Sequence, residues 1–121
     1  TSLVKYYAIL YLGDIVEINT ENKQKVIGNL RNLRKNNKDI SVNISISKVL
    51  YQLGNKAELN ILLNYLDDSN YQNRCATLNC ISEIISSNNF KKIIPILKEK
   101  IKAEVSLAVK ESLENIIKIY N

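Results

Sequence analysis

Few residues in this 121-residue chain have the types and spacing that support catalysis. The sequence contains no His, which removes the usual general base at neutral pH, the Ser/His and Cys/His nucleophile pairs and the commonest metal ligand. The adjacent carboxylates Asp67 and Asp68 lie in a polar segment, where turn formation and helix capping are favoured over metal binding. We therefore expect no catalytic residue, no metal site and no cofactor.

The two cysteines also have a spacing that does not suit redox or zinc chemistry. Cys75 and Cys80 are five residues apart, which places them about 140° apart around a helix axis. They do not form the CxxC spacing of redox and zinc motifs. Both are predicted to act as small apolar side chains on a helix.

The composition is that of one ordinary globular domain, with 45% apolar and 24% charged residues, 3 Gly and 1 Pro. The longest apolar runs are too short to span a bilayer, and no signal segment opens the chain. We therefore expect a cytoplasmic location, and no transmembrane segment in this piece of chain. Because the chain starts with Thr and contains no Met, we also expect it to be a fragment of a longer protein.

An internal repeat defines the elements that would position a binding residue. Four registers start at Val4, Val42, Asn73 and Val105, and each has mostly apolar or small residues at offsets 3, 4, 7, 8 and 11. This spacing marks one face of a helix and not the alternation of a strand. Offset 8 is occupied by Leu12, Leu50, Ile81 and Leu113, and offset 11 by Ile15, Leu53, Ile84 and Ile116. The registers predict four inner helices, over about residues 2–18, 40–53, 70–86 and 103–120.

Three more amphipathic stretches lie between these inner helices and predict outer helices over about residues 22–36, 56–66 and 89–102. Gly54 is placed to end its helix in a left-handed cap, and Ser69 with Gln72 has the spacing of a capping box. Short connections between the helices make neighbours antiparallel. The predicted fold is all-α, a right-handed α-α superhelix of about seven helices in which successive hairpins stack to bury their apolar faces.

The inner-helix register resembles the HEAT-repeat superfamily, and more closely its short bacterial repeats, similar to those of phycobilin lyases. The second helix of that repeat reads Val-Arg-x-x-Ala-x-x-Ala-Leu-Gly-x-Ile. The matching residues here are Val4-Lys5, Ala8, Leu12-Gly13-Asp14-Ile15, Arg74, Ile81, Ile84, Val105, Leu113 and Ile116. The resemblance implies a single armadillo-like domain with repeat units over residues 1–18 (partial), 19–54, 55–87 and 88–121. Asn73 departs from the Val of the pattern, and Asn43 and Ser106 from its basic residue, so a plain helical bundle is the alternative.

In the geometry that this resemblance implies, offsets 2 and 5 of the inner helices lie along the concave side. A row of apolar side chains with polar neighbours on that side would suit a partner helix or an extended peptide. The candidate protein-binding residues are Tyr6, Ile9, Ile44, Lys48, Tyr51, Leu78, Asn79 and Leu107. The alternative is that these residues complete the packing between helices.

The net charge of +5 is concentrated in two clusters on the outer helices, with an acidic stretch between them. The first cluster is Lys23, Lys25, Arg31, Arg34, Lys35 and Lys38, and the second is Lys91, Lys92, Lys98, Lys100 and Lys102. A duplex-binding surface would need an unbroken cationic stripe. The candidate anion-binding residues are Lys91, Lys92, Lys98, Lys100, Lys102, Arg31 and Arg34.

The sequence therefore favours a non-enzymatic protein-interaction or scaffold module that binds a partner helix or peptide on its concave face. The first alternative is binding of nucleic acid or an anionic surface through the basic outer helices. The second is a spacer or regulatory domain of a larger enzyme or membrane protein.

Overall fold

The structure is a computed structural model that describes residues 1–18 and 22–120, and in the first of these ranges the side chains of residues 1–15. The described part is all-helical and has no strand, which confirms the all-α class of the predicted fold. The α-helices are α1 (Ser2–Ile18), α2 (Lys23–Asn36), α3 (Ile40–Gln52), α4 (Glu58–Asn64), α5 (Tyr71–Ile84), α6 (Phe90–Ala103) and α7 (Leu107–Tyr120). A 3-10 turn, η2 (Tyr65–Asp67), follows α4.

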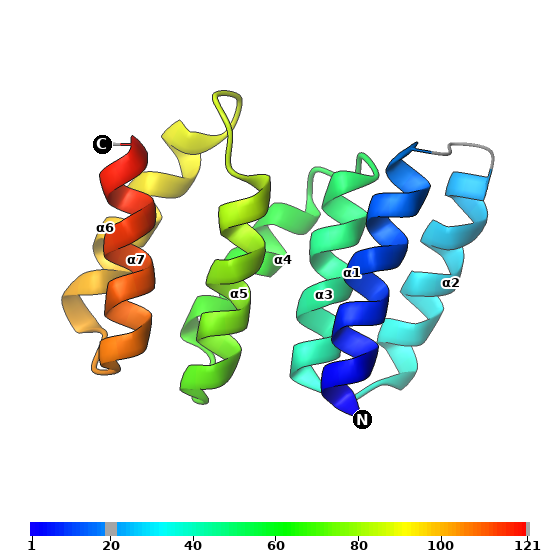
Figure 1. The fold of residues 1–121 in the computed structure, drawn as a ribbon, viewed down its shortest axis with the longest axis horizontal. Helices are drawn as coiled ribbons and strands as arrows, with labels where there is room; N and C mark the ends of the chain where they lie inside the picture. The colour runs from blue at the N-terminus through cyan, green and yellow to red at the C-terminus, as the bar shows by residue number, and fades with distance from the viewer. Residues whose placement is uncertain (19–21, 121) are drawn as a thin grey trace. The chain divides into compact units, whose positions relative to one another are not determined.

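The chain forms two compact units, Thr1–Asn64 and Tyr65–Asn121. In the first unit α3 packs against α1, α2 and α4; in the second, α7 packs against α5 and α6. Figure 1 shows the same order of directions in both units: α1 and α3 run the same way with α2 antiparallel, and α5 and α7 run the same way with α6 antiparallel. Each unit thus contains two inner helices in parallel and the outer helix that connects them.

The core of the first unit is built around α3, on which nine consecutive residues, 42–50, are buried. α3 is buried on every side because α1, α2 and α4 all pack against it. The core cluster consists of Ile9, Ile27, Leu30, Val42, Ile46, Val49, Leu50 and Leu53. In the second unit the buried apolar residues of the last three helices are Leu78, Cys80, Ile81, Ile84, Ile93, Ile94, Leu97, Val109, Leu113 and Ile116.

The starts of the inner helices follow the repeat register. Helices α1, α3 and α5 each begin two residues before the register starts at Val4, Val42 and Asn73. The residue before each of these helices caps it through its side chain. Thr1 Oγ1 accepts from the Val4 amide (3.3 Å), Asp39 from the Ser41 amide (3.0 Å) and Asn70 from the Gln72 amide (2.9 Å).

The turns before α3 and α5 repeat each other in more detail. Two residues before the cap, Asn37 and Asp68 accept a hydrogen bond from the cap amide, at 2.8 and 3.1 Å. Six residues after these turn residues, Asn43 and Arg74 donate to their backbone carbonyls, at 3.1 and 2.8 Å. The spacing of 31 residues therefore repeats a hydrogen-bonding arrangement as well as an apolar pattern.

The ends of several helices depart from prediction; α4, for example, is two residues shorter at each end than the predicted 56–66, and its last predicted residues form the 3-10 turn η2. The cap of α5 is Asn70, one residue after the predicted Ser69, because its amide oxygen is the group that reaches the Gln72 amide. α7 starts four residues later than predicted, since the Glu104 carboxylate accepts hydrogen bonds from the backbone amides of Val105 and Ser106 and holds them outside the helix. α5 ends at Ile84, two residues before the predicted end, and the Asn89 side-chain amide donates a hydrogen bond to the Ile84 carbonyl.

The predicted left-handed cap at Gly54 is present. Gly54 has a φ of 108°, and its amide donates to the Tyr51 carbonyl at 3.0 Å. The next amide, of Asn55, donates to the Leu50 carbonyl at 3.0 Å, which completes the pattern that ends a helix on a glycine.

The close approach of α1 and α3 depends on Gly13. A Cβ atom at this position would lie 2.7 Å from Cγ2 of Val49, a rigid, buried side chain of the core cluster. The two helices can therefore keep their separation only if this position of α1 carries no side chain.

We predict that Gly13→Ala lowers the free energy of unfolding by about 1–3 kcal/mol, because the added methyl group overpacks the α1–α3 contact. The matched control is Gly28→Ala in α2, where a Cβ would meet nothing within 4 Å. That change should raise the stability by about 0.5–1 kcal/mol through helix propensity. Denaturant unfolding followed by circular dichroism measures both, and equal gains in the two variants would contradict the close approach.

Candidate functional site

The structure corrects the predicted concave row. Five of its eight members, Tyr6, Ile9, Ile44, Lys48 and Leu78, are buried and have no surface to offer a partner. In the first unit, Ile44 and Lys48 are buried because α3 is the central helix and its whole middle section is covered. Tyr6 and Ile9 are buried because α1 packs against its neighbours through offsets 2 and 5.

The other three members of the row lie at the surface to different degrees. Asn79 and Leu107 are exposed, and Tyr51 is half-buried with the Lys56 ammonium 4.9 Å from its ring centre. They belong to three different helices, Tyr51 to α3 in the first unit and Asn79 and Leu107 to α5 and α7 in the second.

The exposed apolar surface lies instead along α1. Six large apolar side chains of this helix are between 38 and 68% exposed. We call them the α1 stripe: Leu3, Val4, Tyr7, Tyr11, Leu12 and Ile15. Their spacing of three and four residues places them along one face of the helix, opposite the buried Tyr6, Ile9 and Gly13.

At offsets 8 and 11 the α1 stripe occupies register positions that the other three inner helices bury, whereas at offset 0 only α3 buries its residue, since Asn73 is half-buried and Val105 is 88% exposed. Val4, Leu12 and Ile15 correspond to Val42, Leu50 and Leu53 of α3, all three of which are buried. In α5 and α7, offsets 4, 8 and 11 are likewise buried, as Thr77, Ile81 and Ile84 and as Val109, Leu113 and Ile116. The apolar pattern of this surface is therefore present in the sequence, but the repeat register predicts a buried face on all four inner helices and does not distinguish α1 from the others.

The outward face of α7 provides a contrast. Leu107 and Ile119 are exposed near its two ends, but the positions between them are the exposed residues Glu111, Glu114 and Lys118. This face is polar, as an ordinary solvated helix requires. The continuous apolar surface on α1 is not repeated there.

Several of the candidate anion-binding residues have partners within their own unit. Arg34 pairs with Glu58 through two hydrogen bonds, at 2.5 and 3.0 Å, and Arg31 donates to Asn55 at 2.6 Å. These two arginines fasten α2 to the start of α4. In the second unit Lys100 pairs with Asp67 at 2.5 Å and Lys102 with Glu99 at 2.9 Å. Lys91, Lys92 and Lys98 are exposed on α6.

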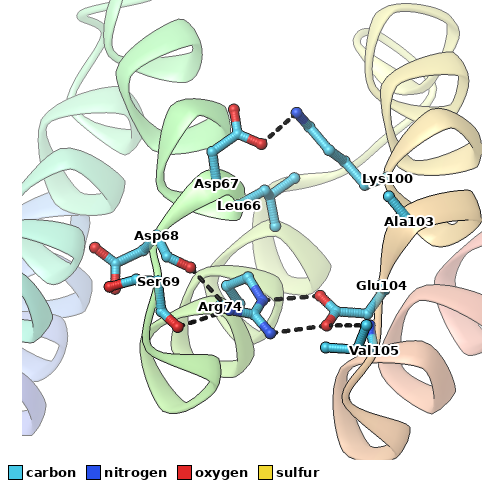
Figure 2. Close-up of a pocket in the computed structure, with 9 residues that line it drawn as sticks. All are labelled: Leu66, Asp67, Asp68, Ser69, Arg74, Lys100, Ala103, Glu104 and Val105. Atoms are coloured by element: carbon cyan, nitrogen blue, oxygen red, sulfur yellow. Dashed lines mark hydrogen bonds and ion pairs between the residues drawn. The ribbon is translucent and has the colours of Figure 1, made fainter.

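A cleft of about 310 Å³ in the second unit is lined by residues of η2, the following turn and the end of α6. Figure 2 shows the Arg74 guanidinium on one side of it, directed at the Glu104 carboxylate on the other. Two hydrogen bonds of 2.8 Å join these groups, and their side chains are only 13 and 7% exposed. The third guanidinium nitrogen donates to the carbonyls of Asp68 and Ser69.

The charged groups of this cleft are therefore used by the fold. The two hydrogen bonds from Arg74 hold the pKa of Glu104 below its ordinary value, with burial acting in the opposite direction and the amide of Ser106 adding to the lowering. Glu104 in turn raises the pKa of Arg74. The arrangement ties the turn before α5 to the turn before α7 and leaves no guanidinium nitrogen for a ligand.

The cysteines are both free thiols, Cys80 buried and Cys75 half-buried. Burial raises the pKa of Cys75, against the opposing influence of the neighbouring Arg74. A raised pKa reduces the thiolate fraction at neutral pH, which makes Cys75 a poor nucleophile.

Three observations complete the description of possible sites. Among the described side chains, those of residues 1–15 and 22–120, no three Cys, Asp or Glu are grouped to hold a metal ion. No helix of the described part of the chain combines the length and apolarity needed to cross a membrane. No family model, no curated protein and no solved structure matches this chain.

We predict that Glu104→Gln lowers the free energy of unfolding by about 2–3 kcal/mol at neutral pH, because it removes the charge from a buried pair and leaves Arg74 uncompensated. Since the pKa of Glu104 is lower in the folded protein than its ordinary 4.5, the contribution is complete above that pH. It is lost as the pH falls through the lowered value. The stability difference between the two proteins should therefore shrink below pH 4.5.

The control for this prediction is Glu99→Gln, which removes one partner of the exposed pair with Lys102. A pair in full contact with solvent contributes little, so this variant should unfold like the unchanged protein at every pH. A difference between the unchanged protein and Glu104→Gln that stays constant from pH 7 to pH 3 would contradict the role given to Glu104.

Proposed function

We propose that the chain is a non-enzymatic interaction module that binds an amphipathic helix of a partner protein along α1. The observation that carries the proposal is the α1 stripe. A helix that is apolar on opposite faces is expected where both faces are covered by protein. The face with Tyr6 and Ile9 is covered within the first unit, so a partner would cover the α1 stripe.

The packing around α3 indicates what kind of partner would fit. α3 buries Val42, Ile46 and Leu50, of which Val42 and Leu50 correspond to Val4 and Leu12 of the α1 stripe, in a cluster to which α2 contributes Ile27 and Leu30. α2 runs antiparallel to α3 and presents apolar residues three or four positions apart (Figure 1). A partner helix with this spacing, antiparallel to α1, would make the same kind of contact.

The aromatic content of the α1 stripe supports a binding surface over a solvated one. Tyr7 and Tyr11 are each at least 60% exposed and lie one turn apart. Tyrosine is enriched in the centres of protein interfaces because it brings a large apolar area and one hydrogen-bonding group. The flanking Lys5 and Asp14 are exposed and would lie at the rim.

The same proposal extends to the architecture. The parallel pairs α1/α3 and α5/α7 and the repeated turns before α3 and α5 are features of stacked helical hairpins. We therefore propose that the chain is a short HEAT-like superhelix that acts as a scaffold.

Selection from a displayed library of designed amphipathic helices tests the proposed function. We expect helices with apolar residues at i, i+3, i+4 and i+7 to be enriched on the unchanged protein. Their binding should be lost on a Tyr7→Lys/Tyr11→Lys variant, which should fold normally because surface substitutions change stability by about 0.5 kcal/mol or less. Circular dichroism checks the fold.

The matched control is Leu107→Lys/Ile119→Lys on α7, which also adds two charges at exposed apolar positions. This variant should keep the binding of the selected helices. Selected helices that bind the Tyr7→Lys/Tyr11→Lys variant as tightly as the unchanged protein would overturn the proposal. Sedimentation velocity provides a second check: a dimer that Tyr7→Lys/Tyr11→Lys dissociates would show that the α1 stripe binds a second copy of the chain instead.

A further inference from the structure

The outward face of α2 carries positive charge and no negative charge. The helix Lys23–Asn36 contains no Asp or Glu, and its solvent side presents Lys25, Lys35 and a series of Asn residues. Lys38 is exposed just beyond its end. Neither lysine of the helix face, nor Lys38, makes an ion pair among the described residues. We call the exposed residues Lys25, Gly28, Asn29, Asn32, Lys35 and Asn36 the α2 face.

Most of the net positive charge of the chain lies in the first unit. Residues 1–64 hold nine Lys and Arg against five Asp and Glu, a net charge of +4, whereas residues 65–121 hold eight against seven, a net charge of +1. On α6 two of the lysines are paired with carboxylates of their own unit, Lys100 with Asp67 and Lys102 with Glu99. The α2 face therefore has the stronger field of the two basic outer helices.

Gly28 lies in the middle of the α2 face, and packing does not explain it. A Cβ at this position would meet nothing within 4 Å, so the fold does not require the missing side chain. Glycine in an exposed helix interior weakens the helix by about 1 kcal/mol relative to alanine. A glycine between cationic and amide side chains permits a ligand to approach the helix backbone closely.

The chemistry of the α2 face selects one class of anionic ligand. An anionic membrane would require several apolar side chains for insertion, but Ile27 and Leu30 of α2 are buried in the core cluster and the single exposed large apolar residue of the helix, Leu33 at 40%, lies outside the α2 face. A polynucleotide requires only cations and amide donors, which bind phosphate oxygens without reading sequence. Lys25 and Lys35 are about 15 Å apart along the helix axis, which matches about four successive phosphates of one strand.

We infer that the α2 face binds the sugar–phosphate backbone of a nucleic acid, with Lys25, Lys35 and Lys38 on phosphates and Gly28 at the point of closest approach. The binding is independent of sequence. The α2 face and the α1 stripe share no residue, so this inference does not depend on the proposed function.

Fluorescence anisotropy of a labelled DNA duplex and of a labelled single-stranded RNA tests the inference, and the two probes show which polynucleotide is preferred. With three lysines on phosphates, the logarithm of the binding constant for the duplex should fall against the logarithm of the salt concentration with a slope of about −3. Lys25→Glu/Lys35→Glu should weaken binding about tenfold or more and reduce that slope by about 2.

The matched control is Lys91→Glu/Lys92→Glu on α6, which makes the same change in net charge on exposed lysines of the other unit. It should leave the salt slope unchanged. Gly28→Ala should weaken binding several-fold although it stabilises the helix, which separates loss of ligand contact from loss of folding.

Three results would overturn the inference. The first is no binding of either probe at low salt. The second is an equal loss of affinity in the α2 and α6 variants, which would mean that only net charge matters. The third is Lys25- and Lys35-dependent binding to vesicles of anionic phospholipid without binding to either polynucleotide.

Discussion

The first unit depends on one constraint, that α3 can be buried on every side only if α1 comes very close to it. Gly13 allows this approach, because a side chain there would collide with Val49. α2 then closes a second side of α3 with Ile27 and Leu30, and Arg34 holds the start of α4 in place through Glu58. The same close packing turns the opposite face of α1 outward, so the exposed α1 stripe follows from the way the core is closed.

In the second unit an ion pair joins two turns that are far apart in the sequence. The side chains of Arg74 and Glu104 are mostly buried, 13 and 7% exposed, and their pair holds the turn that precedes α5 against the turn that precedes α7. At the other end of the unit, the rings of Phe90 and Tyr120 stack 5.8 Å apart and the Tyr120 hydroxyl donates to the Ile85 carbonyl. The charged groups of the cleft consequently serve the fold, and the binding surfaces that we propose are on α1 and α2.

The internal register predicted helix starts well because the local signals and the apolar pattern agree. Thr1, Asp39 and Asn70 stand at the same offset before three inner helices, and each satisfies amides that a helix start leaves free. It failed at α7, where Glu104 is drawn into an ion pair with Arg74, thirty positions earlier in the chain. A capping preference is a property of a few neighbouring residues, whereas such a pair is formed by the tertiary fold.

The sequence by itself determined the all-helical class, the seven helices and the apolar face of each inner helix, since these depend on residues a few positions apart. It could not determine which apolar faces are covered. Val4, Leu12 and Ile15 have the same pattern as Val42, Leu50 and Leu53, yet one set is exposed and the other is buried. Only the tertiary structure decides this, because burial depends on whether another helix packs there, and the side chains themselves are the same in kind.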